Sequence, residues 1–315
     1  MLASPGQRGF SVSADDARGR IGAIEGGGTK FVCAVADASG RLLERTVVPT
    51  RDPAATLDDC VQVFRRAAAR GGRIEAIGIA CFGPLQLRPD APDVGRLLPT
   101  PKPGWSGVDI RSPFRAVTDG PVVIDTDVGC AALGEWQAGA GRGRGSLAYV
   151  TVGTGIGGAV VPQGGPMLMH AEMGHLPVRR DARDDGFHGV CPFHGDCLEG
   201  LANGPAVRAR WGQDLATLPP EHPGRSIIAG YVAQLMAALA LVASPERVVV
   251  GGGVATGGDL LPEIRRATHR WLGGYLPPLQ HAAQIDDWIA APALGADSAL
   301  TGALWLAREA LARRT

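Results

Sequence analysis

The chain has no excess of charge of either sign and very little lysine. Its 315 residues carry 31 basic and 31 acidic side chains, so the formal net charge is zero. Without a global field of one sign, nothing in the composition draws the protein to nucleic acid or to an anionic membrane, and we expect small-molecule partners instead. Lys30 and Lys102 are the only lysines, and we interpret this preference for arginine as a trait of overall composition.

Long apolar runs are also missing. No stretch approaches the roughly 18 consecutive apolar residues that a membrane helix needs, and the N-terminus lacks the apolar segment of a signal peptide. We therefore expect a cytoplasmic protein with no membrane partner. Residues 1–19 are rich in Ser, Gly, Asp and Arg without hydrophobic periodicity, which is typical of a disordered extension.

Two nucleotide-binding motifs are absent. The sequence contains no G-x-x-x-x-G-K-[ST] segment, which argues against a P-loop ATPase. Residues 153–158, Gly-Thr-Gly-Ile-Gly-Gly, match the dinucleotide fingerprint formally, but residues 159–161 are Ala-Val-Val and lead to another turn. A Rossmann pyrophosphate site needs a helix N-terminus at that place, so we reject this interpretation.

What the sequence does contain is one design used twice: an apolar strand, a glycine-rich turn and a second apolar strand. The first copy covers residues 20–36 with its turn at 26–28, and the second covers residues 147–161 with its turn at 153–158. Glycine can adopt positive φ there and, having no Cβ, lets backbone N–H groups approach a phosphate. Each turn alone can be a plain hairpin tip, but together they could hold one polyphosphate.

The remaining apolar segments alternate between helix and strand periodicity, which predicts an α/β architecture. We expect helices over residues 56–70, 128–138, 227–243, 260–272 and 298–312, and strands over 74–82, 122–125 and 247–250. The last of these strands runs into a glycine turn at 251–253. That turn could seat an adenosine, and a plain turn between strand and helix is the alternative.

Asp125 and Asp127 stand where a predicted strand ends and a helix begins. Ligands bind at this place in open α/β sheets. A carboxylate there could accept the proton of a substrate hydroxyl while its oxygen attacks a γ-phosphate. The plainer interpretation is that both aspartates are helix N-caps, and the two roles are compatible.

The segment Cys191-Pro-Phe-His194-Gly-Asp-Cys197 is the most specific chemical pattern in the chain. With His175 as a fourth ligand it matches the Cys₂His₂ set of structural zinc sites, in which four protein ligands leave no open position. His170 and His188 are rival fourth ligands, and a loop in which these side chains merely pack is the alternative. The other cysteines lie singly in apolar runs and look like buried hydrophobes: Cys33, Cys60, Cys81 and Cys130.

In order and spacing, these motifs resemble the ROK family of bacterial sugar kinases, and within it the fructokinase branch, from residue 21 to about residue 310. The matching segments are residues 22–31, 100–105 (Thr-Pro-Lys-Pro-Gly-Trp), 125–128, 151–158, 170–175 and 191–203. The resemblance implies an actin-like ATPase (ribonuclease H-like) fold with two α/β domains around a cleft. We expect a small domain of residues 20–124 plus about 295–315, and a large domain of residues 125–294 that contains the zinc-binding insertion.

The resemblance also implies roles for individual residues. Asp127 matches the catalytic base. Glu172, His175 and Glu199 match positions that contact sugar hydroxyls, and Thr126 is also expected to bind the substrate. The implied cofactors are ATP, Mg²⁺ and a structural Zn²⁺ on His175, Cys191, His194 and Cys197. The residues expected to contact the nucleotide are Gly26, Gly27, Gly28, Thr29, Lys30, Gly153, Thr154, Gly155, Gly157, Gly158, Gly251, Gly252 and Gly253.

We therefore expect an ATP-dependent hexose kinase that converts D-fructose to fructose 6-phosphate and forms a homodimer. Kinases for mannose, glucose or N-acetylmannosamine are alternatives, because Glu25, Gly26 and Gly129 depart from the family's usual residues. A sugar-sensing repressor would need a DNA-binding domain of roughly 60 or more residues before the first glycine turn, and only about 20 precede it. A non-catalytic sugar-binding protein would not need Asp127.

Overall fold

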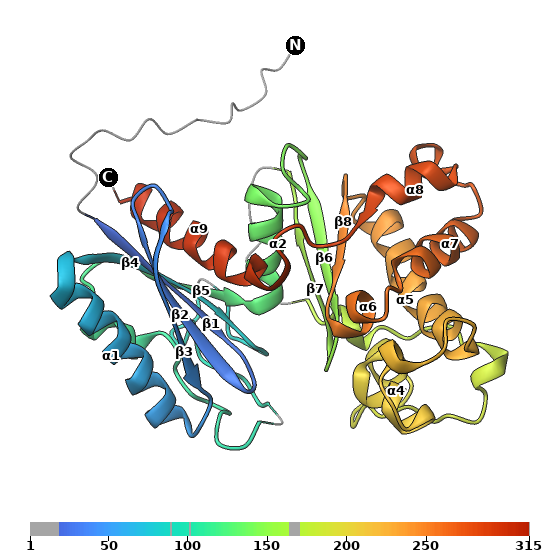
Figure 1. Cartoon of the computed structure of the whole chain (residues 1–315), viewed down its shortest axis with the longest axis horizontal. Helices are drawn as coiled ribbons and strands as arrows, with labels where there is room; N and C mark the ends of the chain where they lie inside the picture. Colours follow the sequence, from blue (N-terminus) through green and yellow to red (C-terminus); the bar gives the residue numbers. More distant parts are fainter. Residues whose placement is uncertain (1–18, 89, 101, 164–170, 315) are drawn as a thin grey trace, which may run out of the picture.

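The computed structural model describes residues 19–88, 90–100, 102–163 and 171–314 (Figure 1). Nearly all of the expected N-terminal extension, residues 1–18, lies outside the described residues, as does His170, one of the rival metal ligands. The described chain forms two mixed β-sheets with helices between and around them.

The first sheet has five strands in the order β3-β2-β1-β4-β5. β1 pairs antiparallel with β2 and β2 with β3, while β4 and β5 run parallel to β1. Helix α1 packs on one face and α9 on the other (Figure 1), so the central strands are apolar on both sides. The elements are β1 (Arg20–Gly26), β2 (Lys30–Asp37), β3 (Leu42–Pro49), α1 (Pro53–Gly71), β4 (Ile74–Cys81), β5 (Val122–Thr126) and α9 (Ser298–Ala312).

The second sheet has four strands in the order β7-β6-β8-β9. It repeats the plan of the first sheet, because β6 and β7 form an antiparallel hairpin and β8 and β9 follow parallel to β6. Helix α2 packs on the hairpin, and α5 and α7 lie on the opposite side of the sheet (Figure 1). The elements are α2 (Asp127–Ala138), β6 (Leu147–Val152), β7 (Ile156–Val161), α5 (Pro223–Val242), β8 (Val248–Gly251), α7 (Leu261–Leu272) and β9 (Ile289–Ala290).

Short helices complete the second half of the described chain. They include η3 (Met173–His175), η4 (Ala182–Asp184), α3 (Leu198–Ala202), α4 (Gly204–Trp211), η5 (Leu215–Thr217), α6 (Gly253–Gly257), η6 (Pro277–Leu279), α8 (Ala282–Trp288) and η7 (Gly295–Asp297). The predicted doubled hairpin is present, with two corrections. Gly26 belongs to β1 rather than to the first turn, and the second strand of the second hairpin begins at Ile156, so Gly157 and Gly158 belong to β7. The division into two domains at the expected boundaries remains a prediction.

Helices α2 and α9 pack against each other between the sheets (Figure 1). Their backbones approach so closely that a Cβ on Gly302 would lie 1.8 Å from the carbonyl oxygen of Cys130, and one on Gly134 would lie 2.1 Å from that of Ser298. Glycine at these two positions is therefore what permits the contact.

A fully buried carboxylate, that of Glu135 in α2, reinforces this junction. It accepts hydrogen bonds from the N–H groups of Ala140 at 2.7 Å, Ala293 at 3.0 Å and Leu294 at 2.9 Å. The hydroxyl of Ser298 donates a fourth at 2.7 Å. Since a buried charge is tolerated only when its acceptors are satisfied, these bonds hold the end of α2 to the segment that leads into α9.

Helix α5 has the length and composition of a membrane-spanning helix, with a mean hydropathy of 1.6, although polar residues and glycine interrupt its apolar residues before the last two turns. In this structure 61% of that apolar window is buried, and α5 packs against α7 and α3. Its composition is thus accounted for by its position in the core beneath the second sheet.

Candidate active site and metal centre

Three strand ends of the first sheet meet at one edge. The register aligns Gly26 of β1 with Cys81 of β4, and Cys81 with Thr126 of β5. The turn at residues 27–29 leaves β1 at this edge, and Asp127 follows β5 there as the first residue of α2. The predicted phosphate turn and the predicted catalytic base therefore lie at the same edge of the sheet.

Helix α2 is capped by Thr126. The threonine hydroxyl accepts a hydrogen bond from the N–H of Gly129 at 2.9 Å, so the interpretation of both aspartates as N-caps is wrong. Asp125 is buried and accepts from the N–H of Thr126 at 2.6 Å. Asp127 lies in the first helical turn and accepts from the N–H of Val128 at 2.9 Å, where the helix dipole favours a negative charge.

Two carboxyl groups near Asp127 resist ionisation. Burial raises the pKa of Asp125 to about 7, and the charge of Asp127 adds to that rise. Burial also raises the pKa of Glu25, again with a further contribution from Asp127. Glu25 lies in β1, and Asp125 lies two strands away in β5 at the same register, one residue before the strand ends. The site thus gathers acidic groups with little water around them.

The first glycine turn is held by hydrogen bonds to its neighbours. The N–H of Gly27 donates to the carbonyl oxygen of Lys30 at 2.9 Å, and Thr50 donates through its hydroxyl to Gly27 and through its N–H to Thr29. None of the glycines in this turn or in the turn after β6 has positive φ, so that part of the explanation for glycine was wrong. The missing Cβ is what matters: one on Gly26 would stand 2.8 Å from the ring of Phe31.

The second turn, residues 153–155, lies against both the metal-binding region and the start of α2. The N–H of Ile156 donates to Oε2 of Glu199 at 2.8 Å, and a Cβ on Gly155 would stand 2.9 Å from that oxygen. On the other side, a Cβ on Gly157 would lie 3.2 Å from Cγ1 of Val128, the residue after Asp127. The beginning of β7 therefore connects Glu199 with the helix that starts at Asp127.

The third glycine turn adjoins the second. Gly252 has a φ of 88°, and a Cβ on it would stand 2.5 Å from the carbonyl oxygen of Val152, so only glycine fits there. Helix α6 begins at the next residue, Gly253, whose nitrogen lies 3.7 Å from the place of a Cβ on Gly153. The residues predicted to contact phosphate and adenosine are thus neighbours at one end of the second sheet.

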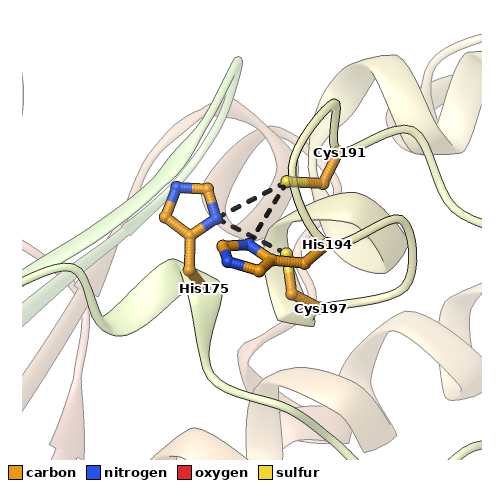
Figure 2. Close-up of side chains that lie close together, drawn as sticks. All are labelled: His175, Cys191, His194 and Cys197. Atoms are coloured by element: carbon orange, nitrogen blue, oxygen red, sulfur yellow. Dashed lines mark hydrogen bonds between the residues drawn. The ribbon is translucent and has the colours of Figure 1, made fainter. Parts of the chain in front are cut away.

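The four predicted metal ligands are brought together (Figure 2), with all their donor atoms within 4.8 Å of one another. Nδ1 of His175 lies 3.6 Å from Sγ of Cys191 and 3.5 Å from Sγ of Cys197, and Nδ1 of His194 lies 3.7 Å from Sγ of Cys191. A tetrahedral zinc ion with bonds of about 2.3 Å to sulfur and about 2.0 Å to nitrogen would separate such donors by about 3.5 Å. The donor set therefore fits zinc.

The backbone shapes this centre in two ways. Cys191 and Gly195 exchange N–H to carbonyl hydrogen bonds of 3.2 and 2.9 Å, forming a tight loop that presents Cys191 and His194 on one side. Gly195 has a φ of 64°, which glycine adopts without strain. The N–H of Leu198 then donates to the carbonyl oxygen of Leu176 at 2.9 Å, which brings Cys197 beside His175. His188, a rival ligand, is not part of the cluster.

The two segments that carry the carboxylates predicted to bind sugar both contact Ile156 of β7. Glu172 is exposed and directly precedes η3, which packs so closely on β7 that a Cβ on Gly174 would stand 2.0 Å from the carbonyl oxygen of Ile156. Glu199 is half-buried in α3 and accepts from the N–H of Ile156. The cluster of predicted metal ligands thus lies between the two segments that carry these carboxylates, and their contact with sugar stays a prediction.

Lys102 lies at the first glycine turn and was not among the residues predicted for the site. Its Nζ stands 3.1 Å from the centroid of the Phe82 ring and 3.3 Å from the place of a Cβ on Gly28. The signals that could have found it were the rarity of lysine in this chain and its position in the segment 100–105.

Comparisons with known proteins agree on one family. The model of the ROK family matches residues 21–310. A fructokinase from Zymomonas mobilis is 43% identical over 91% of this chain and 95% of its own length. A putative fructokinase from Bacillus subtilis is 37% identical over 92% of this chain and 96% of its own length.

Solved structures give the same result. The ROK hexokinase of Thermus thermophilus superposes with a TM-score of 0.76 at 29% identity, covering 93% of this chain and 99% of its own. A ROK glucokinase of Streptomyces griseus, solved with glucose and AMPPNP, gives 0.68 at 27% identity, covering 92% and 99%. These likenesses confirm the expected actin-like ATPase fold. With a family match that spans almost every described residue, the chain belongs to the ROK family.

Proposed function

We propose that this ROK chain is an ATP-dependent kinase that transfers the γ-phosphoryl group of ATP to O6 of D-fructose. The observation that carries the proposal is the position of Asp127, which follows β5 at the sheet edge where the turn 27–29 leaves β1. The choice of fructose is supported by relatives named fructokinase, which are 43% and 37% identical over more than nine-tenths of the chain.

Asp127 would act as the general base. The primary hydroxyl of the sugar would lie against its carboxylate and pass its proton there as the oxygen attacks the γ-phosphorus. Glu172 and Glu199 would accept hydrogen bonds from other sugar hydroxyls and so fix the orientation of the attacking oxygen. Because Oε2 of Glu199 already accepts from the N–H of Ile156, its second oxygen is the one offered to the sugar.

ATP would bind along the three glycine turns. The turns 153–155 and 251–253 adjoin each other, and the turn 27–29 lies beside Asp127. Backbone N–H groups without side chains suit phosphate oxygens. Mg²⁺ would accompany the nucleotide, and Glu25 fits such a cation because its carboxyl is half-buried next to Asp127 with a raised pKa. A divalent ion supplies the positive charge that these crowded oxygen donors lack.

The metal centre would hold Zn²⁺ in a structural role. Two thiolates and two imidazoles fill four positions, which leaves none for substrate. The ion would keep η3 and α3 together and thereby set the directions of Glu172 and Glu199. In this proposal zinc takes no part in phosphoryl transfer.

Glucose is the second candidate substrate. A glucokinase of Streptomyces coelicolor is 29% identical over 91% of this chain, a lower identity than that of the fructokinases. Mannose and N-acetylmannosamine remain alternatives because Gly129 and Glu25 differ from common family residues. A sugar-sensing role is less well supported: the similar ROK transcriptional regulator is only 18% identical and shows the fold alone.

A coupled assay of ADP release across fructose, mannose, glucose and N-acetylmannosamine tests the proposal. We expect the highest kcat/KM with fructose. Asp127→Asn should lower kcat by about 10²- to 10⁴-fold, because the attacking hydroxyl loses its proton acceptor. Binding of fructose to Asp127→Asn, measured by calorimetry, should persist. Equal turnover by the wild type and Asp127→Asn would show that Asp127 is not the general base.

We also propose that the protein is cytoplasmic and acts as a homodimer with two domains per chain. These statements rest on the family and on composition, and sedimentation of the purified protein tests the dimer.

A further inference from the structure

The ammonium group of Lys102 lies at the proposed phosphoryl-transfer site, beside the first glycine turn. Among the residues that the structure describes, no hydrogen bond or ion pair reaches its Nζ, which lies over the face of the Phe82 ring, 3.1 Å from the centroid. The position is half-buried. An ammonium has three hydrogen-bond donors, and the oxygens of an anion can accept from them.

The surroundings of Lys102 indicate which anion that is. Nζ stands 3.3 Å from the place of a Cβ on Gly28, so it faces the middle of the first glycine turn. Asp127 lies near enough for its charge to act on Lys102. The group that would occupy the space between the turn and Asp127 in a kinase is the phosphoryl group in transit.

The rings of Phe82, Trp105 and Phe31 form a packed aromatic platform, and Lys102 lies over the Phe82 ring. The ring of Phe82 packs edge-on against Trp105, with centroids 5.4 Å apart, and Trp105 stacks on Phe31 at 5.5 Å. The N–H of Phe82 donates to the carbonyl oxygen of Gly26 at 3.1 Å, which ties this platform to the glycine turn. A fixed cation aimed at developing charge needs no reorganisation during reaction.

The use of lysine itself supports a specific role. Arginine supplies all but two of the 31 basic residues, and both lysines, Lys30 and Lys102, lie at the same glycine turn. A compact ammonium fits as a point charge between a turn and a carboxylate, where a planar guanidinium would not. Burial lowers the pKa of Lys102, while Cys81 and Asp127 oppose that change.

We propose that Lys102 is a catalytic residue that binds the γ-phosphoryl group during its transfer from ATP to the sugar. The sugar oxygen forms a bond to the γ-phosphorus, and the bond from that phosphorus to the β–γ bridging oxygen breaks with its electron pair, giving ADP. The hydroxyl proton passes to Asp127. Lys102 stays protonated and neutralises the charge on the equatorial oxygens. This inference rests on the proposed kinase function.

The test compares Lys102→Gln with the wild type in two measurements. We expect kcat to fall by about 10²- to 10³-fold, the loss typical of removing one preorganised donor. Calorimetry with AMPPNP and with ADP should show about tenfold weaker binding of AMPPNP, which has a γ-phosphate, and unchanged binding of ADP. Lys102→Met, whose apolar chain still covers Phe82, should show the same selective loss if Lys102→Gln does not fold.

The matched control is Arg88→Gln. Arg88 pairs with Asp90 on the same long loop and is exposed, so its removal should change neither measurement. Equal weakening of AMPPNP and ADP by Lys102→Gln, or a raised fructose KM with unchanged kcat, would overturn the inference. If the wild type phosphorylates no sugar, the proposed function fails, and the two nucleotide affinities still decide whether Lys102 contacts the γ-phosphate.

Discussion

Asp125 is a carboxyl group that the fold keeps away from water. Its pKa of about 7 in the folded protein lies well above its ordinary value of 3.8. The folded state therefore holds a proton on Asp125 between these two values, while the unfolded state has released it. The free energy of unfolding therefore falls as pH rises through this window. The unfolded state releases the proton freely, whereas the folded state must either keep the proton or bury a charge.

This difference predicts the effect of Asp125→Asn. The free energy of unfolding of the wild type should fall, relative to that of Asp125→Asn, by about 3–4 kcal/mol between about pH 4 and pH 8. Urea unfolding of both proteins across this range measures it, and titrating groups that do not interact with Asp125, such as the distant metal ligands, cancel in the comparison. Parallel pH profiles of the two proteins would show that Asp125 has an ordinary pKa.

At the scale of single residues, what could be predicted depended on how local the signal was. Cys191, His194 and Cys197 lie within one short loop, and their spacing alone indicated a metal centre. Lys102 gave no such pattern, because its role depends on Gly28 and Phe82, which approach it only in the folded sheet. Positive φ was wrongly predicted for the glycines of the two hairpin turns, because a glycine in a sequence permits positive φ without requiring it.

At the scale of elements, the proposed metal centre would join η3 to α3. We expect the purified wild type to contain about one zinc per chain, and Cys191→Ser to lose it. His188→Ala and Cys60→Ala should keep the metal, because neither side chain belongs to the cluster. Elemental analysis measures the zinc. Thermal unfolding should show a lower midpoint for Cys191→Ser than for His188→Ala, because only the first loses a proposed metal ligand. Less than about half an equivalent in wild type never exposed to chelator would contradict the site.

Helix packing gives a matched pair of glycine substitutions. Gly302→Ala should destabilise the protein by about 1–3 kcal/mol, since its Cβ would lie 1.8 Å from the carbonyl oxygen of Cys130 and force α2 and α9 apart. Gly230→Ala, in the middle of α5 with no atom within 4 Å of its Cβ, should stabilise by about 0.5–1 kcal/mol. Chemical denaturation measures both, and a loss at Gly230 equal to that at Gly302 would contradict this account of the junction.

Long elements were predicted well and short or exposed ones were missed. Helices α1 and α7 and the strands β4 and β8 have continuous apolar faces or runs, so periodicity located them within a few residues. Strand β3 was missed because it is an edge strand whose charged and exposed residues break the alternation. The short helices α3 and α4 have too few turns for a period, and the metal ligands and the second glycine turn hold α3 in place.

At the scale of the whole molecule, the repeated hairpin explains how one chain can offer phosphate contacts from two sheets. Each sheet places a glycine turn at the tip of its hairpin, and α2 with α9 connects the sheets through close backbone packing and the bonds of Glu135. The repeat itself was visible in the sequence. How the two copies sit relative to each other was not, because it depends on contacts between residues far apart in the chain, such as Gly134 and Ser298.

The most direct test of the central claim is to identify the product formed from D-fructose and ATP. We predict that zinc-loaded wild type forms one ADP for each sugar phosphate, that ³¹P and ¹³C NMR place the phosphate on O6, and that Asp127→Asn forms neither product at a comparable rate. ADP release without a sugar phosphate, or no turnover of any hexose by folded, zinc-loaded protein, would contradict the assignment as a sugar kinase.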